Sequence, residues 1–123
     1  MRKFPKRFLV VLNEILKKYP DYSKNSYMFV YEALDRANHR LEQSLRQSMT
    51  GAELVKDGMV PLAMQRWGFL AEQVFHFWNL KTGVDVGKVV ERLVEFGVFK
   101  KEANDNFEDF NSLNLHEMLS FTF

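Results

Sequence analysis

Signals that begin and end helices alternate between residues 49 and 110, and they constrain the fold more than any other feature of this chain. Thr50 and Glu53 have the spacing of a capping box, in which each side chain bonds to the backbone N–H of the other residue. Gly68 and Gly97 each follow an apolar helical pattern, and each can supply the left-handed residue that ends a helix. This succession predicts an all-α fold.

Apolar side chains recur at helical spacing through most of the chain. Phe8, Leu12 and Ile15 follow the i, i+4, i+7 spacing of one buried stripe. Ser23 is the expected N-cap of the next helix, and Pro61 predicts a kink or break between residues 57 and 62. We expect helices over residues 4–18, 50–67 and 69–78, and over residues 85–96 after the Thr82 cap. A further helix begins at residue 24 and ends between residues 38 and 46.

The resulting fold prediction is a single helical domain, residues 1–123, built as a compact bundle of about five helices. The 12 Phe, 4 Tyr and 2 Trp residues predict an aromatic-rich core, since each ring can bury about 150–250 Å². Residues 40–48 are polar and predict a loop or a frayed helix end. The apolar side chains of the tail, residues 100–123, lead us to expect that the tail docks on the domain.

Charge is unevenly distributed along the chain, although the formal net charge is only +1. Residues 1–46 hold 10 Lys and Arg against 5 Asp and Glu, whereas residues 47–123 hold 7 against 11. Two interpretations remain open. The basic end folds over the acidic end, or it forms a basic face for an acidic partner.

The absence of Cys excludes disulfides, thiolate metal sites and cysteine nucleophiles, and it fits a reducing cytoplasm. No apolar run approaches the roughly 20 residues of a membrane span. The basic N-terminus is followed by a short apolar run, residues 8–12, with no small-residue cleavage site, which is unlike a signal peptide. We therefore expect a cytoplasmic protein with no membrane partner.

The order of several short motifs resembles a known family. The motifs are Tyr27-x-Phe29-Val30-x-Glu32-Ala33-Leu34, Met49-Thr50-Gly51-x-Glu53-Leu54, Trp67-Gly68-x-Leu70-Ala71, Asp85-Val86-Gly87-x-Val89-Val90 and Glu108-Asp109-Phe110. Over residues 20–110 this order is similar to a family of short bacterial proteins of unknown function that is catalogued only by a genome locus name. The resemblance implies an α-helical bacterial domain without an assigned activity. The family usually has His at the position of Ser48.

Residue types that catalyse reactions or bind metals are few. Glu72 and His76 are four residues apart and so lie on one face of a predicted helix, but a metal site needs three or four ligands and no neighbour completes it. The adjacent Glu108 and Asp109 suit a solvated turn better than an acid–base pair. No glycine-rich phosphate loop occurs. We predict no enzymatic activity, no metal and no cofactor.

The aromatic content favours a protein-interaction or structural role. A helical domain of this size has limited interior room for its rings, so we expect a patch that binds another protein or a second copy. Within residues 69–78, the side chains expected to pack inward are Leu70, Ala71, Val74, Phe75 and Trp78. The candidate fold-determining residues are Thr50, Glu53, Gly68, Trp78 and Gly97.

Nucleic-acid binding is the alternative. Residues 69–101 resemble a helix-turn-helix followed by the start of a wing. The candidate contacts in that case are Lys88, Arg92, Lys100 and Lys101. Glu91 and Glu95 on the same helix would partly repel phosphates, so the sequence favours a protein partner over nucleic acid.

Overall fold

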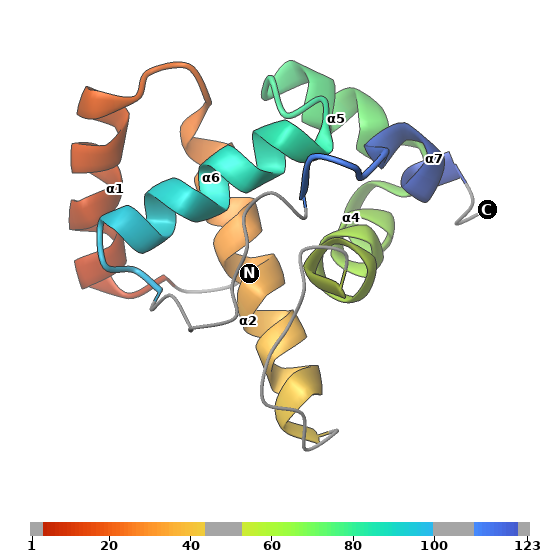
Figure 1. Cartoon of the computed structure of the whole chain (residues 1–123), viewed down its shortest axis with the longest axis horizontal. Coiled ribbons are helices and arrows are strands. Elements are labelled where there is room, and N and C mark those ends of the chain that lie inside the picture. The colour runs from red at the N-terminus through yellow and green to blue at the C-terminus, as the bar shows by residue number, and fades with distance from the viewer. Residues whose placement is uncertain (1–3, 44–52, 100–109, 121–123) are drawn as a thin grey trace.

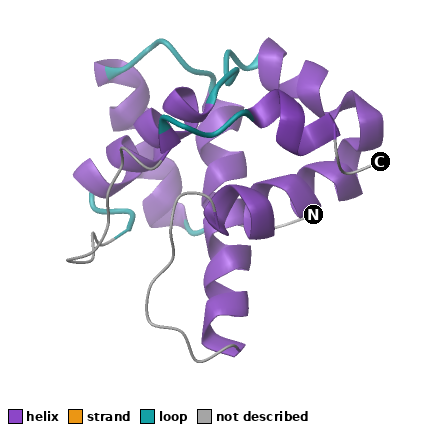
Figure 2. Cartoon of the chain, turned by 45° about the vertical axis from the view of Figure 1, so that its right-hand side comes forward, coloured by secondary structure: helices purple, strands orange, loops and turns teal. Residues whose placement is uncertain are grey.

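The computed structural model describes residues 4–43, 53–99 and 110–120, and these residues form helices and turns with no strand among them (Figures 1 and 2). The predicted all-α class is confirmed. In chain order the elements are α1 (Lys6–Lys18), α2 (Lys24–Gln43), the π-helix η1 (Leu54–Met59), α4 (Val60–Trp67), the 3₁₀ turn η2 (Gly68–Leu70), α5 (Ala71–Phe77), α6 (Gly83–Glu95) and α7 (Leu115–Ser120).

The central element is α2, and α1, η1 and α6 all pack against it (Figure 1). Val30, Leu34 and Ala37 recur at helical spacing along it and are buried together with Tyr27 and Ala33. On α1 the predicted stripe is also buried, at Phe8, Leu12 and Ile15. The buried side chains of the described residues form one continuous hydrophobic cluster.

The starts of α2 and α6 agree with the sequence. The Ser26 N–H donates to Ser23 Oγ at 3.4 Å, which places Ser23 as the cap before α2. Thr82 and Asp85 form a reciprocal capping box at the start of α6. The second helix extends to Gln43, so residues 40–43 of the expected loop are helical.

Pro61 lies in the first turn of α4, directly after the π-helical turn. Proline has no N–H to donate, and its ring clashes with the carbonyl group four residues earlier. A wider turn avoids both problems, and the Val60 N–H accordingly donates to the Val55 carbonyl oxygen, five residues back. The break predicted between residues 57 and 62 is confirmed, and it takes the form of a π-to-α transition.

Two glycines allow close approach between elements. A Cβ atom on Gly58 would lie 2.4 Å from the Ala33 carbonyl oxygen, so η1 meets α2 backbone to backbone. A Cβ atom on Gly83 would lie 2.1 Å from the Phe110 carbonyl oxygen. The ring of Phe110 then lies over Gly87, one turn further along α6.

The described part of the tail, residues 110–120, packs against α6, α4 and α5. Phe110, Leu115 and Leu119 are buried, and α7 contacts both α4 and α5. The remaining tail residues, 100–109 and 121–123, lie outside the described residues. Within the described ranges, no helix is both long enough and apolar enough to cross a membrane.

Candidate functional site

Among the described residues, the two most exposed large hydrophobic side chains lie on η2 and α5. Phe77 is 89% exposed, Phe69 is 76% exposed and Leu70 is 46% exposed. Leu70 and Phe77 are seven residues apart, or about two helical turns, and so lie on one face. The expectation that Leu70 packs inward is wrong, whereas Ala71 and Phe75, which were also expected to pack inward, are buried. We call Phe69, Leu70 and Phe77 the α5 surface.

A cluster of aromatic rings supports the α5 surface from the inside. Phe75 packs edge-on against Phe29, with ring centroids 5.3 Å apart, and Trp78 lies 5.3 Å from Trp67 and 5.8 Å from Phe29. Trp78 is half-buried, and its carbonyl oxygen accepts a hydrogen bond from the buried Ser26 hydroxyl. The cluster therefore fixes α5 to α2 and α4, and the exposed rings project from a rigid support.

The ends of α5 have special backbone conformations. Gly68, the C-cap of α4, has φ +56°, and nothing lies within 4 Å of its missing Cβ, so its backbone conformation is the reason for glycine here. At the other end Asn79 has φ +68°. The Leu80 N–H donates to Phe75 O at 2.8 Å and the Asn79 N–H to His76 O at 3.0 Å, which is a Schellman motif.

Gly97 ends α6 in the same way, as predicted. It has φ +77°, the Val98 N–H donates to Leu93 O at 2.9 Å, and the Gly97 N–H donates to Val94 O at 3.0 Å. Sequence reasoning missed Asn79 in the equivalent position after α5. The available signal was the preference of Asn, second to Gly, for the left-handed conformation.

Glu72, which the sequence places on one helix face with His76, contacts the tail. Glu72 Oε2 lies 2.5 Å from Nδ1 of His116 on α7, and this contact joins α7 to α5 next to the α5 surface. Among the described residues, no three His, Asp or Glu side chains gather in a way that could hold a metal ion.

Arg92, a candidate nucleic-acid contact, is engaged within the molecule. Its guanidinium donates to both carboxylate oxygens of Asp21, at 2.7 and 3.1 Å, and to the Tyr27 hydroxyl at 3.2 Å. It also stacks on the Tyr19 ring, with 4.1 Å between the guanidinium carbon and the ring centroid. The Arg92 side chain is only 13% exposed, so this arginine fastens the α1–α2 turn to α6.

Asp85 of the α6 capping box forms a second link between the α1–α2 turn and α6. The Tyr22 hydroxyl donates to Asp85 Oδ1 at 2.5 Å, and Asp85 Oδ2 accepts from the backbone N–H groups of Lys81 and Thr82 at 2.9 and 3.0 Å. Burial and this hydrogen bond raise the pKa of Tyr22. Burial alone would raise the pKa of Asp85, but the hydrogen bonds that its carboxylate accepts outweigh burial and lower the pKa.

The other candidate nucleic-acid residues are only partly placed. Lys88 is exposed on α6, whereas Lys100 and Lys101 lie outside the described residues. The main packing partner of α6 is α2 rather than α5. The helix-turn-helix interpretation therefore stays a prediction, and Arg92 is the one described candidate that already has an intramolecular partner.

The candidate fold-determining residues also divide between described and undescribed parts of the chain. Thr50 lies outside the described residues, so the capping box predicted at Thr50 and Glu53 stays a prediction. Glu53 is described and already has helical backbone angles, with φ −67° and ψ −38°. Gly68 ends α4, Trp78 belongs to the aromatic cluster behind α5, and Gly97 ends α6.

No protein-family model matches this chain, and comparisons with curated proteins and with solved structures find no significant match. The family resemblance noted from the sequence motifs stays a prediction.

Proposed function

We propose that this protein is a non-enzymatic helical domain that binds another protein through the α5 surface. The observation that supports the proposal is the exposure of two whole phenyl rings, Phe77 at 89% and Phe69 at 76%, on one short stretch of chain. Contiguous exposed apolar groups on a small protein mark interaction sites.

The physical reason lies in the two faces of α5. A helix at the surface of a globular protein normally presents polar residues to water and apolar residues to the core. This helix instead has large apolar groups on both sides, with Phe75 buried and Phe77 exposed. Burying apolar area against a partner contributes about 25 cal/mol per Å², and aromatic residues are enriched at the centres of interfaces.

The binding mode that fits this surface is contact with an apolar face of a partner, either a different protein or a second copy. The absence of Cys supports a cytoplasmic setting for that partner. Nucleic-acid binding is the competing function, and it would depend on Lys88, Lys100 and Lys101 rather than on aromatic rings.

The test is a matched pair of surface variants in a pull-down from the host, with and without nuclease. We expect Phe69→Ser with Phe77→Ser to lose the captured protein partner, while the melting temperature changes little, because Phe69 is 76% exposed and Phe77 is 89% exposed. Val10→Ser, at a 64% exposed position on α1, is the control and should retain the partner.

Two results would contradict the proposal. If the double variant retains every partner, the α5 surface is not the binding site. If all partners disappear on nuclease treatment and binding falls steeply with salt, the competing nucleic-acid function is supported instead. Sedimentation of the purified protein separates a second copy from a different protein.

A further inference from the structure

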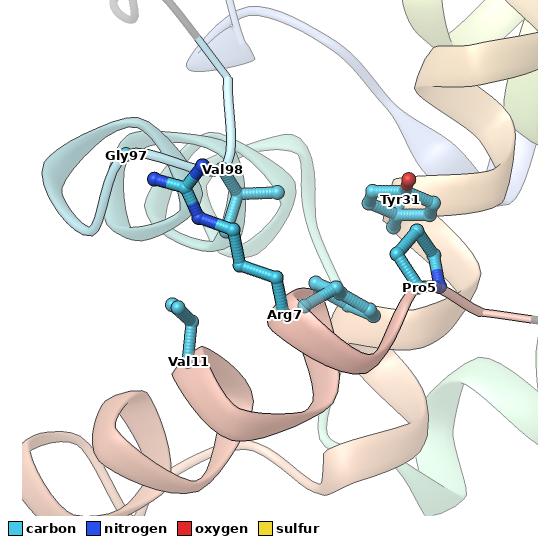
Figure 3. Close-up of a pocket in the computed structure, with 7 residues that line it drawn as sticks. Pro5, Arg7, Val11, Tyr31, Gly97 and Val98 are labelled. Atoms are coloured by element: carbon cyan, nitrogen blue, oxygen red, sulfur yellow. The ribbon is translucent and has the colours of Figure 1, made fainter.

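A cleft of about 160 Å³ lies between the N-terminal half of α1, the middle of α2 and the turn that follows α6 (Figure 3). It is separate from the α5 surface. Pro5, the N-cap of α1, lines it together with Arg7, Phe8 and Val11 of α1, Tyr31 of α2, and Gly97 and Val98 of the turn.

The walls of the cleft are apolar and already formed. The rings of Phe8 and Tyr31 stack with centroids 4.3 Å apart and an angle of 22° between their planes. Phe8 is buried in the core, and Tyr31 also packs against Phe99, with centroids 5.4 Å apart. The Schellman motif at Gly97 fixes Val98 opposite these rings. A ligand would therefore meet a wall that needs little rearrangement.

Arg7 supplies the charge in the cleft. Its side chain rises from α1 and reaches across the opening toward Val98 (Figure 3). It makes no hydrogen bond or ion pair with any other residue of the described ranges. A guanidinium group matches the geometry of a carboxylate and binds it through two parallel N–H donors.

We propose that this cleft binds a small monocarboxylate that carries one aromatic ring or an apolar group of similar size. The ring would lie against Tyr31, Val11 and Val98, and the carboxylate would pair with Arg7 at the opening. The volume supports a ligand of this size, since a cavity of about 150 Å³ holds one benzene ring.

The experiment is an NMR titration of the full chain with phenylacetate and with its uncharged analogue phenylacetamide. We expect phenylacetate to shift the methyl resonances of Val11 and Val98 with a Kd on the order of 1 mM, as suits a ligand of few atoms. Phenylacetamide should bind about fivefold more weakly, because it lacks the charge that pairs with an exposed arginine.

Substitution of the arginine makes the test specific. Arg7→Gln should bind the two probes equally, and the exposed position of Arg7 means that the fold is retained. Lys17→Gln removes a charge from the other end of α1 and should leave the preference for phenylacetate unchanged. The proposal is overturned if the Val11 and Val98 methyls do not shift, if wild type binds both probes equally, or if Lys17→Gln acts like Arg7→Gln.

Discussion

Arg92 joins three separate parts of the chain through a single side chain. It bonds Asp21 in the α1–α2 turn and Tyr27 on α2 while its plane stacks on Tyr19. Only a planar group with several donors can make these contacts together, so lysine would not be an equivalent residue here. The role is structural, although sequence position alone suggested a contact for phosphate.

Replacing Arg92 with Met should lower the free energy of unfolding by about 1.5–3 kcal/mol. The Tyr27 hydroxyl would lose its donor, and α6 would lose its link to Asp21 in the α1–α2 turn. The estimate stays below the value for a fully buried pair because the Asp21 side chain is 47% exposed and can regain water. Urea unfolding measures the change. Arg92→Lys should recover little of the loss.

The matched control is Lys88→Met on the outer face of the same helix. An exposed substitution of this kind should change the free energy of unfolding by no more than about 0.5 kcal/mol. Equal effects of the two substitutions would contradict the structural role of Arg92.

Among the elements, helix ends were easier to predict than helix contacts. Ser23, Thr82 and Gly97 act on backbone groups within a few residues, so their types and spacing carried enough information. The π-helical form of η1 did not follow from Pro61 alone, because it also depends on the close packing of Gly58 against α2.

The candidate site was predictable only in outline. The number of aromatic residues indicated that some rings would be exposed, but the choice of Phe69 and Phe77 depends on how the Gly68 turn orients α5. The pairings of Arg92 with Asp21 and of Glu72 with His116 join residues far apart in sequence, at separations of 71 and 44. Local spacing contains no information about such contacts.

Gly83 provides a test of the contact between α6 and the tail. In an exposed helix, Gly→Ala stabilises by about 0.5–1 kcal/mol. Here the new Cβ would lie 2.1 Å from a backbone oxygen and 2.9 Å from the Leu113 Cβ, so Gly83→Ala should destabilise by about 1–3 kcal/mol. Thermal or urea unfolding measures the difference.

Gly87→Ala is the graded comparison on the same helix. Its Cβ would lie 3.0 Å from the Phe110 Cβ, a milder contact that a small shift of residue 110 relieves. We expect Gly87→Ala to cost less than Gly83→Ala. If Gly83→Ala were stabilising, the close approach of residue 110 to α6 would be refuted.

At the scale of the whole molecule, the carboxylates that link α6 to the α1–α2 turn contribute to its stability in acid. The hydrogen bond from Arg92 lowers the pKa of Asp21, and the hydrogen bonds to Asp85 outweigh its burial and lower its pKa from the usual value. A carboxyl group with a lowered pKa in the folded state stabilises the fold above its unfolded pKa. That stability is lost as the pH falls through the folded pKa.

The free energy of unfolding should therefore decrease as the pH falls below about 4. Asp85→Asn should be less stable than wild type at neutral pH and should approach wild type in acid, because Asn does not titrate. Tyr22→Phe removes one hydrogen bond to Asp85 and should also give a shallower decrease. Urea unfolding between about pH 2 and 7 measures these curves, and parallel curves for all three proteins would contradict the assignment.

The packing of Phe110 over Gly83 and Gly87 has a consequence for biosynthesis. The ribosome makes α6 before it makes Phe110. The face of α6 at Gly83 and Gly87 is therefore exposed to solvent until Phe110 has been translated. The same holds for the sides of α4 and α5 that α7 covers. The described core can close only after the residues up to Leu119 have left the ribosome.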